Sequence, residues 1–216
     1  MTLRHTQRAA VHGQRFTLVE LLTVMVIMAI LLAVTVPVII KVTSGSSVEA
    51  ASRMVGAQLR LARQEAIVRR KSVAVLFPTV DLSSTEKTGY AAFRSCVLKA
   101  GSYEFDSWVP NTVWSYAPVG AVIAEADMDG GTGASAPPDL VDDDGASKVW
   151  VSTVPGFASD VRAVVFRPSG KLATPQRTVT VVEGAAAGST WTHKNDANWV
   201  NVDLNQYTGR VTFVRP

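Results

Sequence analysis

Side chains that could perform catalysis are few and scattered in this sequence. Cys96 is the only cysteine among the 216 residues, and it lies in the apolar run FRSCVL, which favours a small buried residue in a strand. His193 is the only histidine beyond the first fifteen residues, and we expect it in a polar loop, TWTHKNDAN. The spacings G-x-S-x-G, H-E-x-x-H and C-x-x-C do not occur. The sequence therefore predicts no enzyme, no catalytic residue and no cofactor.

Carboxylates concentrate in residues 126–147, ADMDGGTGASAPPDLVDDDGAS. Five of them could supply the oxygen ligands that Ca²⁺ takes, namely Asp127, Asp129, Asp142, Asp143 and Asp144. The segment lacks the twelve-residue EF-hand spacing with its closing glutamate. We therefore expect a solvated loop without a metal, and Ca²⁺ binding is the alternative.

Glu20 is the only charge in an otherwise apolar run, residues 16–40, FTLVELLTVMVIMAILLAVTVPVII. The residues after it are uncharged up to the end of the run, and at about 1.5 Å per helical residue they span the roughly 30 Å core of a bilayer. Arg4, Arg8 and Arg15 precede the run without any acid, which predicts a single-pass segment with a cytoplasmic N-terminus. A carboxylate at the rim of such a segment is costly unless it has a partner.

The phrase FTLVELL after a short basic leader resembles the class III signal of type IV pilins and pseudopilins. The resemblance implies that a prepilin peptidase cuts between Arg15 and Phe16 and that Phe16 is then N-methylated. It also implies that Glu20 pairs with the α-amine of Phe16 in a neighbouring subunit during assembly, and that Pro37 kinks the helix. The family has glycine before the cut where this chain has Arg15, so an unprocessed membrane anchor is an alternative.

Residues 46–72, SSVEAASRMVGAQLRLARQEAIVRRKS, show the periodicity of an amphipathic helix. The apolar stripe recurs at spacings of three and four residues and comprises Val48, Ala51, Val55, Leu59, Ala62 and Ala66. We expect Ser46 or Ser47 to cap this helix and the basic residues 69–71 to end it. The preceding residues 44–47, SGSS, are expected to form a flexible joint to the apolar helix.

After residue 71 the pattern changes to short runs typical of strands, separated by turns. The runs are residues 72–77, 90–98, 119–124, 149–154, 161–167, 178–183, 200–204 and 210–214. The last two runs and the turn NQYTG between them predict a β-hairpin with Gly209 at positive φ. These strands, packed on one helix, predict an α+β fold.

Three motifs in this part resemble the GspH/FimT branch of the pseudopilins. They are LRLARQEAI at residues 59–67, FRPSG at 166–170 and TGRV at 208–211. The resemblance implies a pilin-like fold in which a long N-terminal helix packs on antiparallel β-sheets. Without the resemblance, FRPSG is simply a strand that runs into a turn.

Taken together, these features predict four segments: a cytoplasmic leader (1–15), a transmembrane and filament-core helix (16–40), an amphipathic helix (41–71) and a periplasmic β-rich domain (72–216). The resemblance implies a minor pilin or pseudopilin, a structural subunit of a type II secretion pseudopilus or a type IV pilus. It would reside in the bacterial inner membrane and enter a filament after processing. The implied partners are other pilin or pseudopilin subunits, the prepilin peptidase and the inner-membrane assembly platform.

DNA binding for uptake, which some FimT-like minor pilins perform, is a second hypothesis. Arg210 and Arg215 near the C-terminus are its local support. Residues 72–216 carry 11 Lys and Arg against 15 Asp and Glu, so their mean field repels a polyanion and nucleic-acid binding is not expected. Trp191 and Trp199, which we expect to flank a loop, are candidates for a partner surface.

Overall fold

The computed structural model describes residues 17–83, 85–124, 149–173 and 178–215, and of residues 34–45 and 196 it describes the backbone only. The chain divides into two compact units, residues 1–41 and 42–216. A single helix, α1 (Leu18–Arg69), contributes to both units. Among the described residues, no helix combines the length and the apolarity that a membrane span requires.

The second half of α1 is the centre of the larger unit. All six residues of the predicted stripe, Val48 to Ala66, are fully buried, which confirms the helical period expected for them. Residues 44–47 are helical, so the break in the helix expected there is wrong, and Ser46 and Ser47 lie inside α1 and not at its N-terminus. Glycine and serine lower helix propensity by at most about 1 kcal/mol each, which does not break a helix as proline does.

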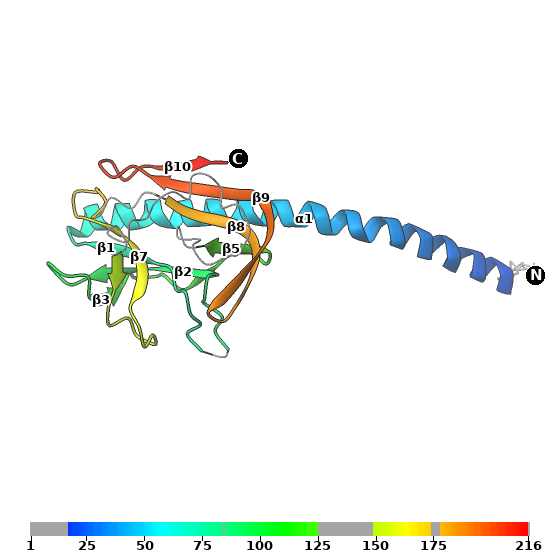
Figure 1. Cartoon of the computed structure of the whole chain (residues 1–216), viewed down its shortest axis with the longest axis horizontal. Helices are drawn as coiled ribbons and strands as arrows, with labels where there is room; N and C mark the ends of the chain where they lie inside the picture. Colours follow the sequence, from blue (N-terminus) through cyan, green and yellow to red (C-terminus); the bar gives the residue numbers. More distant parts are fainter. Residues whose placement is uncertain (1–16, 84, 125–148, 174–177, 216) are drawn as a thin grey trace, which may run out of the picture. The chain divides into compact units, whose positions relative to one another are not determined.

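The first sheet packs on α1 and has the strand order β3–β2–β1–β7–β6, with β4 also paired to β2. Figure 1 shows β1, β2, β3 and β7 of this sheet beside the second half of α1. Its strands are β1 (Val73–Leu76), β2 (Ala92–Leu98), β3 (Phe105–Trp108), β4 (Ser115–Tyr116), β6 (Val149–Val151) and β7 (Val161–Phe166). The sheet curls, because the N–H of Phe105 donates to the Ser152 carbonyl (3.0 Å) and the N–H of Ser152 donates to the Tyr103 carbonyl (3.1 Å). These bonds join the start of β3 to the end of β6, and so bring the two edges of the sheet together.

A second core cluster fills the face of this sheet that points away from α1. It contains buried side chains of β1, β2, β6 and β7, among them Cys96. Four partly buried aromatic rings pack against it in a row of edge-to-face contacts, Phe105–Trp108–Trp114–Phe157, with centroid separations of 4.8, 5.7 and 5.9 Å. Arg94 stacks on Trp108 at 3.9 Å, so a cation also lies against this row.

The second sheet also packs on the α1 stripe and has the order β10–β9–β8–β5. Its strands are β5 (Ala121–Ala124), β8 (Thr178–Ala187), β9 (Thr190–Leu204) and β10 (Val211–Val214). Among the described residues, the strand pairs named above are antiparallel, and the contact of Glu104 with Ser152 that joins the sheet edges is an isolated parallel bridge. This pairing confirms the α+β fold of a helix on antiparallel sheets.

The β8–β9 hairpin is longer than the sequence predicted, and this corrects the position of His193. His193 lies within β9, paired with Gly184, and not in a loop. Trp191 and Trp199 lie on the same strand and do not flank a loop; Trp199 is buried and Trp191 packs on Tyr90. The β9 part of the extension has polar residues at both odd and even positions, and its β8 part is GAAA, so it lacks the alternation by which strands are identified in a sequence.

Candidate functional site

The three family-like motifs meet at one junction on the second half of α1. Two of them, LRLARQEAI and FRPSG, are in direct contact there. Arg63, from LRLARQEAI, donates through Nε to the carbonyl of Gly170, the last residue of FRPSG, at 3.3 Å. Gly170 has φ +79° and its N–H donates to the Arg167 carbonyl (2.8 Å), which closes a tight turn after β7. A Cβ on Gly170 would meet the Ile67 side chain at 2.8 Å, so the turn rests directly on the helix.

Gly209, from TGRV, completes this junction. It has φ +63°, as the sequence predicted for the turn between β9 and β10. A Cβ at this position would lie well within 3.0 Å of the Gly170 carbonyl oxygen, a separation that real Cβ atoms essentially never show. The hairpin is fixed further by the Leu172 N–H, which donates to the Gln206 carbonyl (3.1 Å). The three motifs therefore fasten the C-terminal hairpin and the β7 turn to one point of α1.

The turn itself is ordered by Asn205. Its Oδ1 accepts hydrogen bonds from the N–H groups of Tyr207 (3.1 Å) and Thr208 (3.0 Å), and its carbonyl accepts from Gly209 N–H (2.7 Å). An Asn side chain that bonds the backbone two residues on is a typical turn former. This explains why NQYTG folds into a tight loop between two strands.

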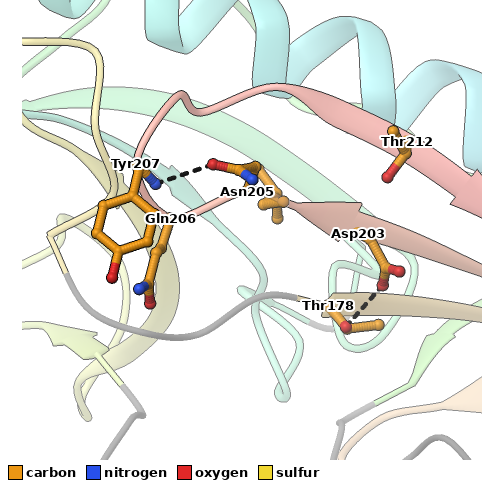
Figure 2. Close-up of a pocket in the computed structure, with 7 residues that line it drawn as sticks. Thr178, Asp203, Asn205, Gln206, Tyr207 and Thr212 are labelled. Atoms are coloured by element: carbon orange, nitrogen blue, oxygen red, sulfur yellow. Dashed lines mark hydrogen bonds between the residues drawn. The ribbon is translucent and has the colours of Figure 1, made fainter.

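A pocket of about 360 Å³ opens beside this turn on the outer face of the second sheet. Figure 2 shows the side chains that line it, which come from β8, β9, β10 and the turn. Thr178, Asp203 and Thr212 are cross-strand neighbours and form one row. Thr178 Oγ1 donates to Asp203 Oδ1 at 2.8 Å. Sequence reasoning missed this site, although the alternation in VNVDL places Asp203 on the face opposite the buried Val202 and Leu204.

The two C-terminal arginines do not form a free basic patch. Arg215 forms an ion pair with Glu49 near the start of the buried part of α1, and Glu49 also binds Arg53 at 2.7 Å. Partial burial opposes ionisation of Glu49, but the hydrogen bonds and charges of Arg53 and Arg215 outweigh it and lower its pKa. Arg210 lies at the hairpin turn, where its N–H donates to Thr208 Oγ1 (3.3 Å). Only Arg210 of this pair is thus free of an acidic partner within the described residues.

Comparison with known protein families covers the first two of these motifs. Residues 51–199 match the family model of "Type II transport protein GspH", which covers more than half of the chain. The chain belongs to the GspH family. Searches of curated proteins and of solved structures gave no match.

In this GspH-family chain, the described residues of the N-terminal segment show how Glu20 is placed. Thr17 precedes α1, and its Oγ1 accepts the N–H of Glu20 at 3.2 Å. Thr17 and Glu20 thus have the T-x-x-E spacing of a capping box, with Glu20 at the third helical position. Sequence reasoning missed Thr17, although this spacing was visible. Arg15 and Phe16 lie outside the described residues, as do Asp127, Asp129, Asp142, Asp143 and Asp144.

The remaining candidate residues of the GspH-family chain, Cys96 and His193, pack within the β-sheets. Burial raises the pKa of the Cys96 thiol to about 12, so it stays protonated and is a weak nucleophile. His193 contacts the Trp191 ring edge-to-face at 6.1 Å. Within the described residues, no group of three or more His, Cys, Asp or Glu side chains is placed to hold a metal. At position 37 the backbone of α1 is helical, and the kink expected at Pro37 stays a prediction.

Proposed function

We propose that this chain is a minor pseudopilin or pilin, a structural subunit of a type II secretion pseudopilus or a type IV pilus. Residues 16–40 would hold it in the bacterial inner membrane with residues 42–216 in the periplasm, and α1 would assemble with helices of other subunits. Membership of the GspH family is the observation that carries this proposal. The exposed surface of α1 gives it physical support.

Apolar side chains cover the first described turns of α1. Between Leu18 and Leu32 their exposed fractions range from 49% for Val26 to 81% for Leu18. A contiguous apolar surface of this kind on a natural protein indicates contact with lipid or with another protein. Contact with lipid and contact with another protein are both expected of a subunit that is first held in a membrane and then enters a filament.

A second apolar stripe lies on α1 within the larger unit, apart from the buried one. Met54, Leu61 and Val68 are 38%, 39% and 76% exposed and are spaced by seven residues. A seven-residue repeat keeps one line of side chains on the same side of a helix, which suits packing against a second helix. The domain covers the other side of α1 and leaves this stripe for a partner.

Processing between Arg15 and Phe16, with N-methylation of Phe16, is part of the proposal. Intact mass of the full chain extracted from membranes, with and without an active prepilin peptidase, tests it directly. The mature species should begin at Phe16 and carry one added methyl group. A chain that still begins at Met1 or Thr2 in cells with active peptidase would contradict processing and favour the unprocessed anchor.

Two substitutions separate the roles that Glu20 could have in assembly. Glu20→Gln keeps a side chain that a capping box accepts but removes the charge, whereas Glu20→Ala removes both. If Glu20 pairs with the α-amine of a neighbouring subunit, both variants should insert normally and lose co-purification with other pilin subunits. Glu65→Gln, which removes a charge from the last turns of α1, where Glu65 pairs with Arg69, is the control. Retained assembly of Glu20→Gln alone would show that Glu20 only caps the helix.

A further inference from the structure

Asp203 is a half-buried carboxylate that has no cationic partner within the described part of the chain. Among the described side chains, Thr178 donates a hydrogen bond to it, from Oγ1 to Asp203 Oδ1 at 2.8 Å. That bond fixes the orientation of the carboxylate in the pocket of about 360 Å³ beside the β9–β10 turn. A partly desolvated charge in a pocket is a strong recognition element, since its interactions are less screened than those on an open surface.

The other groups that line this pocket define the chemistry of its ligand. None of the described lining residues is basic, and around one negative charge they supply hydroxyl, amide and phenol groups: Thr178, Asn205, Gln206, Tyr207 and Thr212. Figure 2 shows the Gln206 and Tyr207 side chains together on one side of the pocket, with Asp203 and Thr178 on another. One carboxylate is too few for Ca²⁺, which takes six to eight oxygens. A guanidinium fits, because its planar fork donates several hydrogen bonds and carries the opposite charge.

The sheet beside the pocket offers a way for a peptide to deliver such a group. β10 is the last strand in the order β10–β9–β8–β5, and within the described residues its outer edge pairs with no strand. An exposed strand edge is a template for an added extended segment. A residue of that segment opposite Thr212 would extend the row Thr178–Asp203–Thr212, and a long side chain there would point over Thr212 toward Asp203.

We infer that the β10 edge and the Asp203 pocket together bind an extended segment of a partner protein that inserts an arginine side chain. The main chain of the segment pairs with β10, and its guanidinium binds the Asp203 carboxylate. The site uses only residues of β8, β9, β10 and their turn, so it does not depend on processing at Phe16 or on assembly through α1. Failure of those proposals would leave this one intact.

A synthetic hexapeptide with alternating β-branched residues and one central arginine, acetyl-TVRVTV-amide, is the probe. Binding to the full chain in detergent micelles is followed by backbone amide chemical shifts and by calorimetry at low salt. Three related peptides replace the arginine with lysine, replace it with the neutral isostere citrulline, or flank it with prolines that cannot donate to a strand edge. Asp203→Asn is the test variant, and Asp160→Asn, which neutralises an exposed aspartate elsewhere, is its control.

The expected result is binding of the arginine peptide with shifts at Thr178, Asp203, Thr212 and β10. Asp203→Asn should weaken it about tenfold or more, as expected for a charge-assisted hydrogen bond, and Asp160→Asn should not. The lysine peptide should bind less tightly, and the citrulline and proline-flanked peptides should bind weakly at best. No binding of the arginine peptide, equal binding of the citrulline peptide, or an unchanged affinity in a folded Asp203→Asn protein would overturn the inference. Equal binding of the proline-flanked peptide would overturn the role of the β10 edge.

Discussion

Replacing Gly209 with alanine should destabilise the larger unit more than the same change at a glycine of similar positive φ that has free space around it. Two costs add at this position. At φ +63° an L-residue is disfavoured by about 1–2 kcal/mol relative to glycine. The new Cβ also overlaps the Gly170 carbonyl oxygen, and relieving such overpacking typically costs about 1–3 kcal/mol.

Gly188 provides a matched control in the turn between β8 and β9. It has φ +67°, nearly the same backbone conformation, but a Cβ there would meet no atom within 4 Å. Gly188→Ala therefore has only the conformational cost, part of which is offset because alanine restricts the unfolded chain. The difference between the two variants, about 1–3 kcal/mol, isolates the contact between the hairpin and the β7 turn. For a unit of this size that corresponds to roughly 2–12 °C in Tm.

Thermal and urea unfolding of the full chain in detergent micelles, followed by circular dichroism, measures both variants. The added Cβ would also approach Arg63 Cδ at 2.8 Å, so Arg63→Ala combined with Gly209→Ala tests which neighbour matters. The long Arg63 side chain can move aside, whereas the Gly170 backbone is held in its own turn. We therefore expect no rescue in the double variant. Equal losses for Gly209→Ala and Gly188→Ala, or full rescue by Arg63→Ala, would refute the reasoning.

Three further predictions each concern a single residue. Arg70, at φ 54°, ends α1 in the left-handed region, so Arg70→Gly should stabilise the protein by about 1 kcal/mol in the same unfolding assay. Cys96, buried and with a pKa raised to about 12, should react with iodoacetamide at pH 8 only after denaturant is added, as read by intact mass. Glu49 has a lowered pKa in the folded chain, so its stabilising effect is present above its ordinary pKa of 4.5 and is lost as the pH falls below it. Glu49→Gln should thus flatten the acid side of the stability profile, and an unchanged profile would contradict the pairing with Arg215.

The features predicted correctly from the sequence were those with a strong local signal. The α1 stripe repeats over five turns, and each of its six residues is fully buried. The terminal hairpin has a turn-forming asparagine, a glycine at the required position and alternating flanks. Strands such as β3, FDSW, were missed because their exposed edge positions carry polar residues and show no apolar alternation. The long β8–β9 extension was missed because its β8 part is GAAA and its β9 part is polar at successive positions, so neither part alternates.

The sites were harder to predict because they depend on contacts between distant segments. Arg63 and Gly170 are separated by 107 positions, and nothing in either motif indicates that one binds the other. The pairing of Arg215 with Glu49 spans 166 positions and removes the basic patch that the sequence suggested. Asp203 is one of many acidic residues in the sequence, and only the strand register places it between Thr178 and Thr212.

The C-terminal hairpin also determines which surface of α1 stays available. Phe213 of β10 rests on Gly56, where an added Cβ would lie 2.6 Å from the ring, and Arg60 stacks over the same ring at 5.5 Å. β10 is fastened to α1 at its start through the Gly209 junction and beyond its end through Arg215 and Glu49. Within the larger unit, one side of the helix is thus occupied by the core and another by β10, and the Met54–Leu61–Val68 stripe is an apolar line that stays partly exposed. A partner helix that packs on this stripe, as the proposed assembly requires, would lie beside the side of α1 that β10 covers.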